Sequence, residues 1–158
     1  MNRERALAMI EKHEGFVALP YRDSKGYWTV GCGELISRDT NLTYQEACDL
    51  CLPLPWTHQR ARARIGEHLD KIETRLDHAI PWWRALGAGP QLVLVDLAYN
   101  MGVGSSGPPS GLLGFRHMLN AAQAGDIETA IAEMVDSQWA RDVGLERVND
   151  NIALWREA

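Results

Sequence analysis

The sequence EGFVALPYRDSKGYWTVGCG, residues 14–33, is the most informative stretch of this chain. It follows residues 3–14, where apolar side chains stand at helical spacing, and Gly15 is typical of a helix end. Inside the stretch, the turn-forming run Asp23–Gly26 lies between aromatic and β-branched residues, which predicts short strands and a hairpin. We therefore expect a helix that ends at Glu14 and leads into a small sheet.

Outside this stretch the chain predicts mostly helices. Thr43–Glu46 has the pattern of a capping box that opens a short helix. Thr57 can cap the next helix, and residues 57–80 keep an apolar stripe at three- and four-residue spacing, which predicts one long helix. Residues 102–111, GVGSSGPPSG, predict a flexible loop. Further helices, the first of them buried, are expected over residues 91–101, 111–124, 127–136 and 145–157. The expected fold class is α+β, with helices dominant.

The composition is that of one compact globular domain. Of the 158 residues, 46% are hydrophobic and 23% are charged, and the formal net charge is −5. An acidic balance argues against a nucleic-acid partner, because such proteins usually carry a basic face. No apolar run approaches the roughly 20 residues of a membrane span, and no apolar segment follows the charged N-terminus. We therefore expect neither membrane insertion nor a secretory signal peptide.

Two carboxyl groups near residue 20 suit the hydrolysis of a glycosidic bond. Eight residues separate Glu14 from Asp23, and five separate Asp23 from Thr29. Glycoside hydrolysis needs one protonated acid and one ionised carboxylate, which different environments can supply. The negative end of a helix dipole at Glu14 favours the neutral acid, and a turn keeps Asp23 solvated. Both residues are also common as solvated charges without a catalytic role, so spacing alone leaves both interpretations open.

Two short motifs have simpler explanations. Gly102–Gly107 matches GxGxxG, but two prolines follow and no βαβ unit surrounds it, so no dinucleotide site is expected. Cys48 and Cys51 form a CxxC late in a short helix, whereas a redox pair would open a helix and a zinc site would need four ligands. Without a signal peptide, these thiols and Cys32 are expected to be reduced and buried. We expect no metal and no organic cofactor.

The segment 14–33 closely resembles the catalytic segment of phage-type lysozymes, glycoside hydrolase family 24, to which T-even and lambdoid phage endolysins belong. That family shows Glu, eight residues, Asp or Cys, five residues and Thr. The accompanying positions also match: Gly15, Tyr21, Gly26, Gly31 and Gly33. The resemblance implies one lysozyme domain over residues 1–158. It would have a β-containing N-terminal lobe at about 14–56, a connecting helix at 57–80, and a helical lobe of 81–158 with 1–13.

The resemblance also implies a role for each matched residue. Glu14 would be the general acid. Asp23 would position or activate water, or stabilise the oxocarbenium charge, and Thr29 would position the water or the intermediate. The saccharide cleft would be lined by Gly33, Leu35, Tyr99 and Asn100. The implied reaction is muramidase hydrolysis of the β-1,4 bond between N-acetylmuramic acid and N-acetylglucosamine.

The same resemblance implies a biological setting. The protein is expected to be a monomeric endolysin of a phage or prophage, with peptidoglycan glycan strands as its partner. It would accumulate in the host cytoplasm and act on the wall in the periplasm after a holin opens the membrane. Two other functions fit the same residues: a lytic transglycosylase, which uses one Glu and forms an anhydro product, and an inactive peptidoglycan-binding or tail-structural relative. A nucleic-acid module is a distant third.

Two positions depart from the family pattern. Many relatives carry His after the second glycine, where this chain has Glu34. A third carboxylate there would favour the protonated form of Glu14 by like-charge repulsion, unless Glu34 points into solvent. Near Arg147 the family often has a second Arg or an Ala, and a Glu four residues on, where this chain has Val148 and Asn151. Whether Arg147 braces Glu14 therefore stays open.

Overall fold

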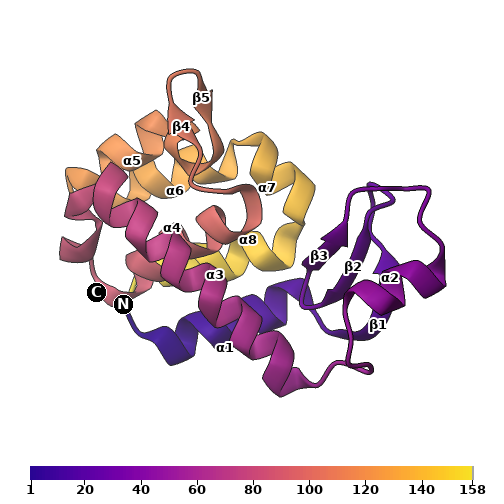
Figure 1. Ribbon diagram of the computed structural model, residues 1–158. Coiled ribbons are helices and arrows are strands. Elements are labelled where there is room, and N and C mark those ends of the chain that lie inside the picture. The colour runs from indigo at the N-terminus through magenta and orange to yellow at the C-terminus, as the bar shows by residue number, and fades with distance from the viewer. Residues whose placement is uncertain (158) are drawn as a thin grey trace. The chain divides into compact units, whose positions relative to one another are not determined.

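The computed structural model describes residues 1–157 and shows an α+β fold dominated by helices, as predicted (Figure 1). The chain forms two compact units. The sheet unit comprises Leu7–His68, and the helical unit comprises Met1–Ala6 together with the chain from Leu69 onward. The first helix therefore contributes from Leu7 on to the sheet unit, whereas the expected lobes grouped residues 1–13 with the helices. The assignment of residues 1–158 to one lysozyme domain stays a prediction.

The sheet unit contains a three-stranded antiparallel sheet of order β1–β2–β3, which confirms the predicted hairpin and adds a third strand. The strands and the helix before them have the following bounds: α1 (Arg3–Glu14), β1 (Val17–Arg22), β2 (Trp28–Gly31) and β3 (Glu34–Ser37). All four residues of β2 are buried, as the aromatic and β-branched character of this segment favours. At the end of β2, Gly31 has φ 66°, and a Cβ there would lie 2.8 Å from the Trp56 ring. Only glycine suits this position.

Two helices follow the sheet, and both begin at the predicted caps. Before α2 (Tyr44–Leu50), the Thr43 hydroxyl accepts a hydrogen bond from the Glu46 amide, and the Glu46 carboxylate accepts one from the Thr43 amide. Before α3 (His58–Ala79), the Thr57 hydroxyl accepts a hydrogen bond from the Arg60 amide over 3.1 Å. The predicted apolar stripe of α3 is buried at Ala61, Ile65, Leu69 and Leu76.

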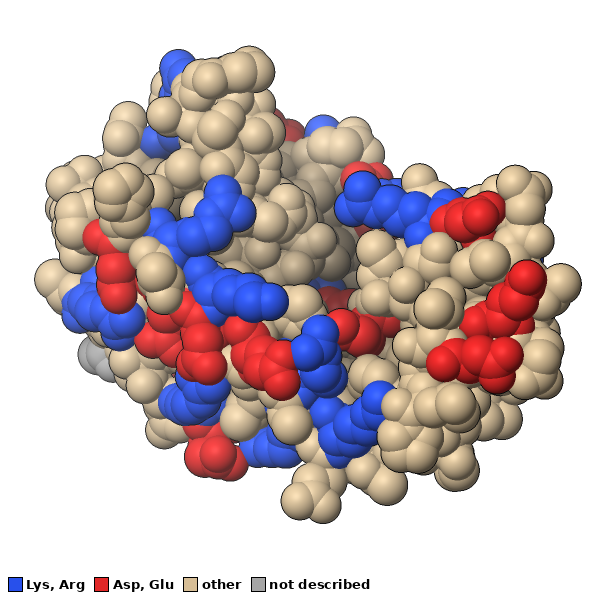
Figure 2. Space-filling view, viewed as in Figure 1, with Lys and Arg blue, Asp and Glu red and all other residues tan. Residues whose placement is uncertain are grey.

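The exposed side of α3 carries both signs of charge. Arg62 pairs with Glu11, and Arg64 pairs with Glu34 and Glu67. Figure 2 shows Lys and Arg interleaved with Asp and Glu over the face where this helix lies. The arginines at the start of α3, Arg60, Arg62 and Arg64, thus lie among carboxylates and do not form a cationic stripe.

The helical unit is built around α4 (Ala88–Met101), whose residues from Gly89 to Ala98 are all buried. This confirms the predicted buried helix, although it begins before Pro90. The other elements of the unit are η1 (Pro81–Ala85), β4 (Ser105–Ser106), β5 (Pro109–Ser110), η2 (Gly111–Gly114), α5 (Arg116–Gln123), α6 (Ile127–Val135), α7 (Gln138–Val143) and α8 (Leu145–Trp155).

Two sequence predictions in this unit were wrong in detail, and one helix was missed. Residues 102–111 are not simply a flexible loop, because Ser105 pairs with Ser110 and Ser106 with Pro109 in a short hairpin. The helix expected over 111–124 is divided into η2 and α5 at Phe115. The six-residue helix α7 was not predicted, because it is too short for its apolar periodicity to be recognised.

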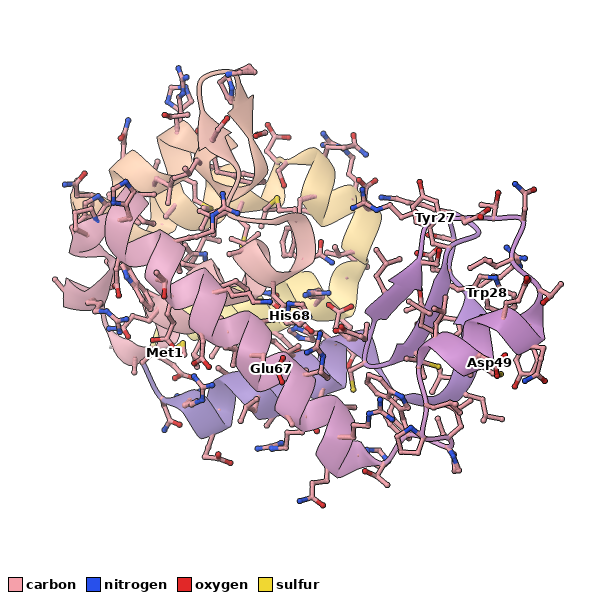
Figure 3. All side chains as sticks on the ribbon, in the orientation of Figure 1. Met1, Tyr27, Trp28, Asp49, Glu67 and His68 are labelled. Carbon is pink, nitrogen blue, oxygen red and sulfur yellow. The ribbon has the colours of Figure 1, made fainter. Side chains whose placement is uncertain are left out.

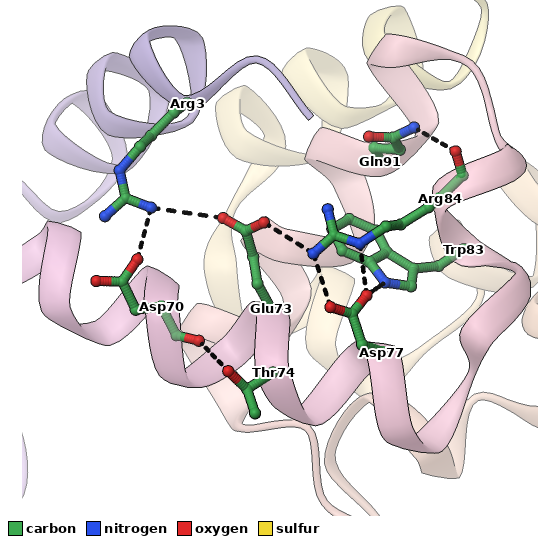
Figure 4. Close-up of polar contacts among 8 residues, drawn as sticks. All are labelled: Arg3, Asp70, Glu73, Thr74, Asp77, Trp83, Arg84 and Gln91. Atoms are coloured by element: carbon green, nitrogen blue, oxygen red, sulfur yellow. Dashed lines mark hydrogen bonds and ion pairs between the residues drawn. The ribbon is translucent and has the colours of Figure 1, made fainter.

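A network of ion pairs joins three segments of the helical unit (Figure 4). Arg3 at the start of α1 contacts Asp70 and Glu73 of α3 at 2.8 and 3.5 Å. Glu73 in turn pairs with Arg84 of η1 at 3.1 Å. Arg84 also pairs with Asp77, and its guanidinium lies 4.6 Å from the Trp83 ring. These groups are mostly exposed, so each pair adds little to the free energy of unfolding.

Neither a membrane helix nor a disulfide occurs in the described part of the chain. Over residues 1–157, no helix is both long and apolar enough to cross a bilayer. The three cysteines are free and buried, as predicted.

Candidate active site

Glu14 is the last residue of α1, and its carboxylate lies against the turn between β2 and β3. The helix ends here because Gly15 adopts φ 70°. Glu14 is partly buried. A Cβ built on Gly33 would lie 3.5 Å from Glu14 Oε2, so the backbone of the turn packs directly beside the carboxylate. The structure therefore brings Glu14 and Gly33 together from opposite ends of the 14–33 segment.

Asp23 closes the turn between β1 and β2. Its Oδ1 accepts hydrogen bonds from the amides of Lys25 and Tyr27, over 2.8 and 2.9 Å. Its carbonyl accepts a third hydrogen bond, from the Gly26 amide. These contacts give the partly buried carboxylate a defined position.

Thr29 lies in the centre of the sheet and is only 4% exposed. Its hydroxyl donates a hydrogen bond to the Tyr27 carbonyl over 3.3 Å. Because the Tyr27 amide donates a hydrogen bond to Asp23, Tyr27 (labelled in Figure 3) connects Asp23 with Thr29, two of the three predicted catalytic residues. Leu35 pairs with Thr29 across the sheet and is 43% exposed, so it offers apolar surface beside this residue.

Tyr21 belongs to the same site, although the sequence assigned it no role. Burial raises the pKa of its hydroxyl, and the negative charges of Asp23 and Glu14 raise this pKa further. Tyr21 pairs with Thr29 across β1 and β2, which places it on the sheet that bears the predicted catalytic residues. In the sequence, only its match to the family motif indicated this residue. The neutral phenol can donate a hydrogen bond.

Cys32 lies in the turn between β2 and β3, and its thiol is buried. Burial raises the pKa of its thiol, and the charges of Glu11 and Glu14 add to this effect. A raised pKa keeps the thiol protonated at neutral pH, so Cys32 has no nucleophilic character there. In residues 1–157, no three His, Cys, Asp or Glu side chains gather as a metal site.

Glu34 neither points into solvent nor lies unpaired beside Glu14. Its side chain is 17% exposed, and its carboxylate contacts Arg64 and His68 of α3. Burial would raise the pKa of Glu34, but hydrogen bonds from Arg64 and His68 outweigh burial and hold the pKa below its usual value. The solvent-facing alternative was therefore wrong. The two partners also counteract the like-charge effect expected on Glu14.

The remaining two predicted cleft residues, Tyr99 and Asn100, belong to the helical unit and not to the sheet unit. Both lie at the end of α4, where Tyr99 is partly buried and Asn100 is exposed. Asn100 Oδ1 accepts a hydrogen bond from Trp139 Nε1 over 3.0 Å. Asn100 and Trp139 line a pocket of about 600 Å³, together with residues of η2, α5, α6 and α7. A pocket of this volume suits a small ligand.

Arg147 on α8 has a buried carboxylate partner on another helix. Its guanidinium donates two hydrogen bonds to Asp96 of α4, over 2.8 and 3.1 Å. Asn151, one turn later on α8, donates a further hydrogen bond to Asp96 over 2.7 Å. Asp96 thus supplies the carboxylate that the sequence around Arg147 lacks. The bracing of Glu14 by Arg147 stays a prediction.

The fold is lysozyme-like: a helix that ends in a glutamate, a small antiparallel sheet bearing an aspartate and a threonine, and a mainly helical remainder. Comparison with known families matches residues 11–153 to the family described as phage lysozyme. The match covers most of the chain, so this protein belongs to the phage lysozyme family.

One relative is a bacteriophage protein. The chain is similar to the pre-baseplate central spike protein Gp5 of Enterobacteria phage T4, with 29% identity over 144 residues. The similar region covers 83% of this chain and 24% of Gp5. The chain therefore spans about a quarter of the length of this relative.

Proposed function

We propose that this protein is a muramidase of glycoside hydrolase family 24 that hydrolyses the β-1,4 bond between N-acetylmuramic acid and N-acetylglucosamine. Glu14 protonates the leaving oxygen, and Asp23 activates water or stabilises the positive charge that develops on the sugar. Thr29 positions the water or the intermediate. Gly33, Leu35, Tyr99 and Asn100 contact the glycan strand.

One observation carries this proposal. In the sheet unit, Glu14 packs against Gly33 in the turn between β2 and β3, and Asp23 is held in the turn between β1 and β2 by two amide hydrogen bonds. Two partly buried carboxyl groups thus stand on one small sheet, as a reaction with one proton donor and one ionised group requires. Membership of the phage lysozyme family supports the same reaction class.

The first test is the clearing of outer-membrane-permeabilised Gram-negative cells by the native protein and by Glu14→Gln. We expect the variant to lose activity by about 100-fold or more, because the amide cannot donate the proton. Glu4→Gln is the matched control, since Glu4 lies exposed in the first turn of the same helix. Full activity of Glu14→Gln would show that another group is the acid. Inactivity of the native protein across pH 4–8 would instead favour a binding or structural role.

Mass spectrometry of the released muropeptides separates hydrolysis from lytic transglycosylation. A hydrolase adds water and leaves a reducing N-acetylmuramic acid, whereas a transglycosylase leaves a 1,6-anhydro product. Asp23 and Thr29 support hydrolysis. Anhydro products as the main species would contradict the assignment.

For the biological role, we propose an endolysin that acts as a monomer. It collects in the host cytoplasm and reaches the periplasmic wall through a holin-dependent membrane lesion. The similarity to Gp5, a central spike protein, supports a second candidate, a wall-cleaving component of a phage tail. Proteomics of purified particles and of the soluble fraction of induced cells distinguishes the two. An endolysin is found in the soluble fraction, and a tail component is found in the particles.

A further inference from the structure

Glu34 occupies a position from which it can control the turn beside Glu14. It is the first residue of β3 and directly follows Gly33, whose backbone packs against the Glu14 carboxylate. Gly33 has φ 78° and no side chain of its own. Gly33 can therefore be held only by its backbone and by the residues that flank it.

The Glu34 side chain is fastened to α3 through both carboxylate oxygens. Oε1 accepts hydrogen bonds from Arg64 Nη2 and Nε, over 2.5 and 3.2 Å. Oε2 contacts His68 Nε2 over 2.7 Å. Arg64 and His68 lie one helical turn apart, so they contact the carboxylate from two neighbouring positions of α3. Figure 3 labels His68 on this helix.

The charges around this group favour a firm attachment. The Glu34 side chain is only 17% exposed, and a charge-assisted hydrogen bond is stronger where water is excluded. Arg64 also pairs with the more exposed Glu67, and Arg60 lines the same pocket of about 270 Å³ beside Glu34. Glu34 thus contacts two basic side chains of α3, and the third, Arg60, lines the same pocket; Glu67 is an acidic neighbour on that helix.

We infer that Glu34, anchored on α3 by Arg64 and His68, is a positioning residue that holds the β2–β3 turn against Glu14. The inference rests on the proposed function for its catalytic consequence. Consecutive Cα atoms are about 3.8 Å apart, so a shift of Glu34 is passed directly to Gly33. Loss of the anchor lets the turn move, and the geometry around the acid is then no longer defined.

The test begins with His68→Leu, which removes one anchor without touching the turn. NMR amide signals of Gly31 and Gly33 report the position of the turn and need no activity. We expect both signals to shift, and kcat to fall about 10-fold with little change in KM, because small misplacements of catalytic groups mainly slow the chemical step. Asp77→Asn is the control, since Asp77 on the same helix pairs with Arg84 in the other unit.

Exchange of the two residues provides the rescue. His68→Glu alone places two carboxylates together, and we expect it to lower both Tm and kcat. Adding Glu34→His to His68→Glu restores opposite charges in the reverse order, and we expect Tm and kcat to recover at least halfway. No recovery would overturn the proposed anchor between residues 34 and 68.

The remaining outcomes separate this inference from the proposed function. A lower Tm in His68→Leu with native glycine signals and native kcat would make the pair merely structural and overturn the inference. If the native protein does not cleave peptidoglycan, the proposed function fails. Shifted glycine signals would then still support the anchoring of the turn, and unchanged signals would overturn it.

Discussion

At the scale of single residues, the site depends on a backbone that runs beside a carboxyl group. Gly33 combines φ 78° with a position in which a Cβ would lie 3.5 Å from Glu14 Oε2, an ordinary van der Waals contact. Two features thus coincide at one residue, a left-handed backbone and contact with the acid. A substitution at Gly33 tests both at once, so a second glycine is needed to separate them.

Gly33→Ala is expected to lower both stability and activity. The left-handed conformation costs an alanine about 1–2 kcal/mol of unfolding free energy. The added methyl group would contact Glu14 Oε2, so a shift of the strained turn is passed to the acid and should reduce kcat about 10-fold. Gly125→Ala is the matched control, because Gly125 has the same φ of 78° with nothing within 4 Å of its Cβ position. Urea unfolding should show similar losses in both variants, and an equal loss of activity in both would contradict a specific contact with Glu14.

At the scale of elements, the Glu34 carboxylate joins β3 to α3, and its charge affects the free energy of unfolding. Hydrogen bonds from Arg64 and His68 outweigh the burial of Glu34 and lower its pKa from the ordinary value of 4.5. A carboxyl group with a lowered pKa binds its proton less tightly in the folded state than in the unfolded state. Its stabilising contribution is therefore complete above the unfolded pKa and is lost as the pH falls through the folded pKa.

Acid should therefore destabilise the native protein partly through Glu34. Between about pH 5 and pH 3, we expect the unfolding free energy from urea titrations to fall more steeply in the native protein than in Glu34→Gln. Glu128→Gln serves for comparison, because Glu128 pairs with Arg156 on the surface, where the side chains are 70% and 57% exposed. Slopes that are identical in the native protein and in Glu34→Gln would refute the linkage.

At the scale of the whole molecule, each of the two units has an interior of its own, and the helical unit contains a buried charge pair. The side chains of Asp96 and Arg147 are 0% and 8% exposed, and Asn151 completes the hydrogen bonding of the carboxylate. Removing both charges from such a site is often tolerated, whereas removing one leaves the other unpaired in a medium that solvates it poorly.

Arg147→Met is accordingly expected to lower the unfolding free energy by about 3–5 kcal/mol. The double variant Asp96→Leu with Arg147→Met should be more stable than Arg147→Met alone, because no unpaired charge remains. Urea unfolding followed by tryptophan fluorescence measures both. A single variant as stable as the native protein would mean that Asp96 is stabilised by other groups.

Local sequence patterns were sufficient to predict the helix caps at Thr43 and Thr57, the apolar stripe of α3 and the hairpin around Asp23. Each depends on residues a few positions apart, which repeat or hydrogen-bond within one element. The motif also indicated the catalytic candidates. The contacts of Gly33 with Glu14, Glu34 with His68, and Asp96 with Arg147 were not predictable in this way. These residues lie on different elements, and only the packing of the folded chain decides which side chains contact each other and which charged groups form ion pairs.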